Sequence, residues 1–125
     1  MRELERHVRW IGGRPVEVYG WQLAQGDTRE QATAAVLSGD HNPNAGNWSG
    51  IELWRRVEGG YVAFQTRMRR DKACTYVISG PTLKTLWNKV LTDFESNVGP
   101  GWPTYWSDVW DNAVRANEEL DKEAV

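Results

Sequence analysis

The most constraining feature of the sequence is a pair of alternating segments that flank two glycines, IELWRRVE-GG-YVAFQTRM at residues 51–68. Apolar and polar residues alternate with the period of a β-strand on both sides of Gly59-Gly60, and two adjacent glycines are typical of a two-residue hairpin turn. Counting outward from such a turn predicts three cross-strand pairs: Arg56 with Ala63, Trp54 with Gln65, and Glu52 with Arg67. The core is therefore expected to form on an antiparallel sheet.

This register assigns the side chains of the hairpin to two faces. The core face is expected to consist of Ile51, Leu53, Val57, Val62, Phe64 and Met68, with Arg55 as its one charged member. The open face is expected to carry Trp54, Arg56, Tyr61, Gln65 and Arg67. Because directly opposite residues point to the same side of a sheet, the pairing predicts that the ring of Trp54 is exposed to solvent.

The flanking segments add further strands and one short helix. Two short strands are predicted within residues 7–25, joined at Gly12-Gly13, and a helix is predicted within residues 26–39. Residues 40–51 have the composition of a loop. A turn at residues 69–72 leads to another strand at residues 73–80. Its register stays open: an even loop pairs Phe64 with Val77, whereas an odd loop brings Tyr76 or Ile78 opposite Phe64.

The last third of the chain is predicted to form two amphipathic helices. The first follows Pro81 and repeats apolar residues at i, i+3 and i+4, namely Leu83, Leu86, Trp87, Val90, Leu91 and Phe94. The second follows Pro103 and carries one apolar stripe of Trp106, Val109, Trp110, Ala113 and Leu120. A helix with a single apolar stripe must bury it, so Trp87, Trp106 and Trp110 are expected to belong to the core.

These elements together predict an α+β fold. The 125 residues are expected to form a single globular domain, residues 1–125, with the order ββ-α-βββ-αα. The sheet is expected to be antiparallel, with the two C-terminal amphipathic helices packed on one of its faces. A single cysteine, Cys74, and a charged N-terminal segment without an apolar signal-peptide core predict a cytoplasmic protein.

Charge is unevenly distributed along the chain. The net charge is −2, but residues 55–89 carry 8 basic and 2 acidic side chains, and residues 90–125 carry 2 basic and 8 acidic ones. One arrangement consistent with such asymmetry is a basic face on an acidic protein. The alternative is internal neutralisation, with the acidic C-terminal helix lying against the basic strands.

The sequence does not carry a recognisable catalytic or metal-binding pattern. Asp40, Asn42 and Asn44 resemble the start of a calcium loop, but Ala45 and Ile51 stand where that loop needs glycine and glutamate. Two separated histidines and one cysteine do not have zinc-site spacing. We therefore predict no metal, no cofactor and no catalytic residue, and we regard enzymatic activity as the weaker hypothesis.

The basic hairpin is the one group of residues with a positive functional argument, because arginine, tryptophan and tyrosine are typical of binding surfaces. The predicted partner-binding residues are Trp48, Trp54, Arg56, Tyr61, Gln65, Arg67, Arg69, Arg70 and Lys72. The favoured hypothesis is a non-catalytic protein acting by protein–protein contact, such as a small accessory or inhibitor protein of a mobile element. The alternative is a nucleic-acid-binding module that uses the basic hairpin. A third hypothesis is a small enzyme that uses the loop at residues 40–50.

Overall fold

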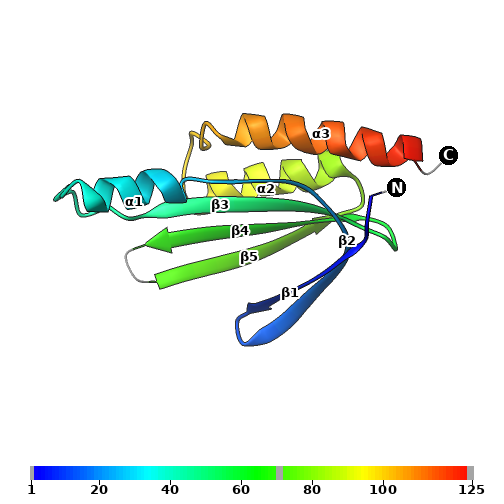
Figure 1. Cartoon of the computed structure of the whole chain (residues 1–125), viewed down its shortest axis with the longest axis horizontal. Helices are drawn as coiled ribbons and strands as arrows, with labels where there is room; N and C mark the ends of the chain where they lie inside the picture. Colours follow the sequence, from blue (N-terminus) through cyan, green and yellow to red (C-terminus); the bar gives the residue numbers. More distant parts are fainter. Residues whose placement is uncertain (1, 70–71, 124–125) are drawn as a thin grey trace.

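The computed structural model describes residues 2–69 and 72–123. Within these residues the elements follow the order β1 (Glu5–Ile11), β2 (Arg14–Asp27), α1 (Arg29–Leu37), β3 (Trp48–Arg56), β4 (Tyr61–Arg69), β5 (Lys72–Gly80), α2 (Leu83–Asn97) and α3 (Trp106–Glu123). The strands form an antiparallel sheet in chain order, and α2 and α3 lie side by side on one face of it (Figure 1). The predicted α+β order, ββ-α-βββ-αα, is confirmed.

The turn between β3 and β4 is wider than the sequence predicts. Arg55 pairs with Tyr61 and Trp54 pairs with Val62, so four residues, 57–60, connect the two strands. Two hydrogen bonds close it, from Arg56 N to Gly60 O at 3.0 Å and from Gly59 N to Arg56 O at 3.2 Å. The predicted two-residue turn is wrong because Val57 leaves the hairpin ladder and donates its N–H to the carbonyl of Tyr19 in β2, at 2.9 Å.

In this register, residues of β4 that were predicted to share a face with Ile51 and Leu53 lie on the opposite face of the sheet. Ile51 and Leu53 share a face with Gln65 and Ala63, and that face is the one covered by the helices. The opposite face carries Trp54, Val62 and Phe64, which form a second buried cluster. The prediction that Trp54 and Gln65 lie on an open face is therefore wrong, since Trp54 is 2% exposed and Gln65 is fully buried.

The register of β5 corresponds to an even loop. Phe64 pairs with Val77, and the ladder continues to Arg69, which pairs with Lys72. Of the two alternatives that the sequence left open, the pairing of Phe64 with Val77 is therefore the one observed.

The helix-covered core contains the predicted apolar stripes. Leu86, Val90 and Phe94 of α2 and Trp106 and Val109 of α3 are buried in it. Thr82 caps α2, because its hydroxyl accepts a hydrogen bond from the N–H of Thr85 at 3.0 Å. Trp87 and Trp110 are partly buried and pack against the same core. The prediction that Trp87, Trp106 and Trp110 belong to the core is confirmed for Trp106, which is buried. Trp87 and Trp110 are only partly buried against that core.

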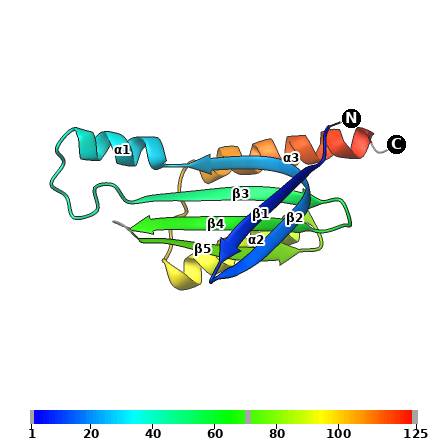
Figure 2. The ribbon, with the colours of Figure 1, turned by 60° about the horizontal axis from the view of Figure 1, so that its bottom comes forward.

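The second face is covered by the chain itself, through a bend in β2. Residues 14–20 of β2 pair with β1, while residues 20–27 pair with β3. The bend occurs at Gly20, where a Cβ atom would lie 1.9 Å from the carbonyl oxygen of Arg55. The β1–β2 hairpin thereby crosses the sheet face opposite the helices (Figure 2). In consequence His7 of β1 stacks on Trp54, with ring centroids 4.9 Å apart.

Candidate functional site

The predicted partner-binding residues do not form one surface. Trp54 and Gln65 are buried, so their side chains are not available to a partner. Arg56 and Tyr61 lie at the turn between β3 and β4, whereas Trp48, Arg67 and Lys72 lie at the opposite end of the strands. Arg70 and the side chain of Arg69 are outside the described part of the chain.

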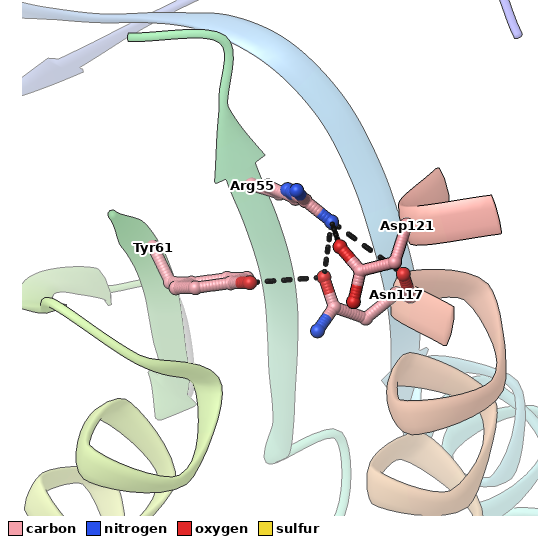
Figure 3. A network of polar contacts seen from close by, with 4 residues as sticks. All are labelled: Arg55, Tyr61, Asn117 and Asp121. Atoms are coloured by element: carbon pink, nitrogen blue, oxygen red, sulfur yellow. Dashed lines mark hydrogen bonds and ion pairs between the residues drawn. The ribbon is translucent and has the colours of Figure 1, made fainter. Parts of the chain in front are cut away.

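At the turn end, Tyr61 belongs to a network that holds α3 (Figure 3). Its hydroxyl donates to Asn117 Oδ1 at 3.0 Å, and Arg55 Nη1 donates to the same oxygen at 2.9 Å. Arg55 Nη1 also donates to Asp121 Oδ1 at 2.7 Å. This ion pair explains why an arginine occupies the core face of β3. It also pairs a basic residue of the strands with an acidic residue of the C-terminal helix. This pairing agrees with the alternative of internal neutralisation, in which that helix lies against the basic strands.

At the opposite end, Arg67 lies between β5 and the C-terminal part of α2. Its Nη2 atom is 3.5 Å from Asp93 Oδ2, and its guanidinium carbon lies 4.8 Å from the ring centroid of Tyr76. The side chain of Arg67 is 15% exposed, and its Nε atom is buried with no hydrogen-bond partner among the described residues.

Two clefts meet at Arg67. One, of about 380 Å³, is lined by Arg67, Lys72, Cys74, Tyr76, Asn97 and Val98. The other, of about 420 Å³, is also lined by Asn47 of the loop before β3, by Trp48 at the start of β3, and by Val98 and Pro103 of the α2–α3 connection. Trp48 is itself capped by Arg29, whose guanidinium carbon is 4.2 Å from the ring centroid. The structure therefore brings together three of the predicted residues, Trp48, Arg67 and Lys72.

A separate groove lies on the helical layer. It has a volume of about 480 Å³ and is lined by Trp87, Leu91, Trp102, Pro103, Thr104, Trp106, Ser107 and Trp110. Trp87 stacks on Trp110 at 5.3 Å between ring centroids and tilts against Trp106 at 5.6 Å. Trp102, in the connection between α2 and α3, is 44% exposed. We call this feature the tryptophan groove.

The tryptophan groove is not among the sites that the sequence predicts. The helical stripe accounts for Trp106 and for one side of Trp87 and Trp110, but not for the ring of Trp102, which precedes α3. The sequence feature that could have indicated the groove is the number of aromatic residues near α3, which is larger than one apolar stripe can bury. The groove also depends on the packing of α2 against α3, which the stripe alone does not describe.

The loop at residues 40–50 uses its oxygen atoms internally. Asp40 Oδ1 accepts from Asn42 N at 2.9 Å, and Asn42 Oδ1 accepts from Asn44 N at 2.9 Å. These bonds are the side-chain-to-backbone turns that Asp and Asn favour. Within residues 2–69 and 72–123, no group of three or more His, Cys, Asp or Glu side chains lies together as a metal site.

A small polar cavity of about 60 Å³ adjoins that loop on the hairpin-covered face. Arg9 Nη1 lies 3.1 Å from Glu52 Oε2 beside it, an ion pair without the geometry of a hydrogen bond. On the helix-covered face, burial raises the pKa of Tyr105, and its hydroxyl lies 3.1 Å from that of Ser49. These groups do not form a nucleophile–base pair with a cavity large enough for a substrate.

Comparison with protein-family models, with curated proteins and with solved structures gave no match for this chain. Among the described residues, no helix has the length and apolar character that crossing a membrane requires.

Proposed function

We propose that this protein is a non-catalytic binding protein that acts by contact with another protein, through the tryptophan groove. A small accessory or inhibitor protein of a mobile element, working in the cytoplasm, fits this proposal. The observation that carries it is the groove itself, an apolar depression of about 480 Å³ lined by four tryptophans of α2, α3 and their connection.

The rings of the groove have the chemistry of a protein-binding hot spot. Tryptophan contributes large apolar area with few rotatable bonds, and it is enriched at the residues that dominate binding energy. Trp87 and Trp110 are held by stacking on each other, and Trp106 is buried in the core against Trp87 and Phe94. The walls are therefore preorganised, and an apolar side chain entering the groove loses little free energy to reordering.

The charge of the residues next to the groove indicates which residues flank the apolar anchor of the partner protein. Asp108 and Asp111 are exposed on α3 beside groove residues Ser107 and Trp110. Further along the same helix, Glu118 and Glu119 are exposed as well, and α3 contains six acidic residues against two basic ones. The proposed occupant is therefore a protein segment with an apolar anchor flanked by lysine or arginine.

Affinity capture with matched tryptophan variants tests the proposal. Trp102→Ala removes an exposed wall of the groove, and Trp10→Ala removes a ring that is 73% exposed on the β1–β2 hairpin, away from the helices. We expect a captured protein that survives nuclease treatment and is lost with Trp102→Ala but not with Trp10→Ala. For that purified partner, Trp102→Ala should weaken binding by about 2 kcal/mol, roughly 30-fold in Kd.

Two results would contradict the proposal. One is a partner retained equally by wild type and Trp102→Ala, which would place binding elsewhere. The other is loss of every captured protein on nuclease treatment, which would favour a nucleic-acid target. Adding 0.5 M salt should slow association with a basic partner, since attraction to the acidic side of α3 is screened.

A further inference from the structure

Arg67 is a charged group whose hydrogen-bonding capacity is only partly used. A guanidinium offers five N–H donors in a planar fork. The one acceptor near Arg67 among the described residues is Asp93 Oδ2, at 3.5 Å from Nη2, and the Nε atom has no partner. The Nε–H is itself enclosed, so a ligand in the adjoining cleft would pair with the remaining N–H donors of the guanidinium.

Asp93 does not complete the pairing of Arg67, because it is also used by its own helix. Its other oxygen, Oδ1, accepts from Asn97 Nδ2 at 3.0 Å, and the side chain of Asp93 is 33% exposed. Lys72 is exposed and lines the same cleft as Arg67. Positive charge therefore exceeds negative charge among the described residues that line this cleft, which favours an anionic ligand.

An aromatic ring stands beside these cations. Tyr76 is exposed over 42% of its surface and lines the cleft of about 380 Å³ with Arg67 and Lys72. The guanidinium of Arg67 lies against this ring at 4.8 Å, so the cation and the ring form one continuous surface. Rings in such positions stack on nucleic-acid bases, and a guanidinium beside them binds the attached phosphate through its fork.

We propose that the cleft between β5 and the end of α2 binds a nucleotide unit. Arg67 and Lys72 hold its phosphate, and Tyr76 stacks on its base. This site lies at the β4–β5 end of the sheet and is separate from the tryptophan groove, so it does not depend on the function proposed above. A free mononucleotide and a single strand of nucleic acid present the same unit, and the experiment below distinguishes them.

The test follows the arginine Nε–H signals of the ¹⁵N-labelled protein by NMR during titration. The probes are inorganic phosphate, adenosine, adenosine monophosphate and a short oligothymidylate. The Arg67 signal is assigned by its absence in Arg67→Lys. We expect it to shift with adenosine monophosphate and with the oligonucleotide, and much less with adenosine.

Variants then separate the contributions of the cleft residues. Arg67→Lys should weaken binding of adenosine monophosphate about tenfold or more, because an ammonium group lacks the fork. Lys72→Ala, at an exposed position, leaves the fold intact and should weaken binding several-fold. Tyr76→Ala should weaken adenosine monophosphate but not inorganic phosphate. Arg14→Ala, an equally basic change at the β1–β2 turn, should have no effect.

The source of the nucleotide follows from two comparisons. A strand is indicated if the oligonucleotide binds more tightly than the mononucleotide and Lys72→Ala reduces its salt slope by about one. A free nucleotide is indicated if both bind equally. The proposal is overturned if no probe shifts the Arg67 signal, if adenosine binds as well as its monophosphate, or if Arg14→Ala weakens binding as much as Lys72→Ala does.

Discussion

Both faces of the sheet carry a buried core, but the two cores have different kinds of cover. Helices α2 and α3 cover one face, and each helix carries an apolar stripe that repeats along its own sequence. The β1–β2 hairpin covers the other face, and it reaches that position because β2 changes partner from β3 to β1 at Gly20. The helical cover is thus specified by many residues, whereas the hairpin cover depends on one bend.

The same difference appears in the size of the two cores. Among residues 2–69 and 72–123, the helix-covered core contains thirteen buried residues and the hairpin-covered core contains four, Val18, Trp54, Val62 and Phe64. Loss of one side chain therefore removes a larger share of the second core. The hairpin-covered face should respond more sharply than the helix-covered face to single changes, and the predictions below test that asymmetry.

The largest expected effect is at Gly20. A Cβ atom there would lie 1.9 Å from the Arg55 carbonyl oxygen, which is backbone and cannot move aside cheaply. Gly20→Ala should lower the free energy of unfolding by about 4 kcal/mol or more, because the strands must separate at the bend. Chemical denaturation measures this loss, and red-shifted tryptophan emission would report exposure of Trp54.

The control for Gly20→Ala is Gly12→Asn, in the β1–β2 turn. Gly12 has a φ of 60°, a conformation that asparagine tolerates, and a Cβ atom there meets no atom within 4 Å. Its cost should stay below about 1 kcal/mol. If Gly20→Ala is as mild as this control, the bend does not depend on a glycine and the asymmetry between the two covers fails.

The next effect compares one tryptophan from each core. Trp106 and Trp54 are both 2% exposed, so replacing either with alanine leaves a large cavity. Each substitution should cost about 3–5 kcal/mol, with Trp54→Ala the costlier of the two because its core is the smaller. An open-face position for Trp54 would instead make its replacement much milder. A Trp54→Ala cost below about 1 kcal/mol, with the full cost for Trp106→Ala, would mean that the hairpin does not pack on the sheet in solution.

A smaller effect is expected where the helical cover is fastened to the sheet. Tyr61→Phe removes the hydrogen bond from the tyrosine hydroxyl to Asn117 Oδ1 while keeping the ring. The expected loss of stability is about 1 kcal/mol, since Asn117 Oδ1 still accepts from Arg55. Thermal unfolding of Tyr61→Phe in an Asn117→Ala background supplies the matched comparison, where the hydroxyl should contribute nothing.

The sequence predicts the order of the elements, the α+β class and the helical stripes because these follow from short-range patterns. The register of the β3–β4 hairpin was mispredicted, since the N–H of Val57 bonds to Tyr19 across the sheet and widens the turn. That error placed Trp54 on the wrong kind of surface. The sequence around Trp54 does not predict that a strand from the N-terminal part of the chain covers its ring.

The candidate sites were likewise predicted only where short-range sequence features sufficed, and not where long-range packing decides. Arg67, Lys72 and Trp48 were marked by their residue types, and the structure brings them to one end of the molecule. Their relation to Tyr76 and Asp93 depends on the packing of α2 against β5, which alternation and helical periodicity do not encode. Tyr61 and Gln65 carried the same residue-type signal, but Tyr61 supports α3 and Gln65 lies in the core.

The smallest effect concerns the pH dependence of the helix-covered face. Burial raises the pKa of Tyr105 above its ordinary value of 10.0, and the negative charge of Asp27 acts in the same direction, while the hydrogen bond with Ser49 opposes them. The folded protein thus holds this proton more tightly than the unfolded chain does, so its stability falls as the pH rises above 10 towards the raised pKa.

Tyr105→Phe isolates this contribution, because phenylalanine keeps the ring against the core and does not titrate. Loss of the contact with Ser49 should cost about 1 kcal/mol at neutral pH. The difference in unfolding free energy between wild type and variant should stay constant up to about pH 10 and then shrink. Urea denaturation from pH 7 to 11 measures it. A difference that stays constant throughout would place the hydroxyl of Tyr105 in contact with water, and α3 would then be a looser cover than its apolar stripe implies.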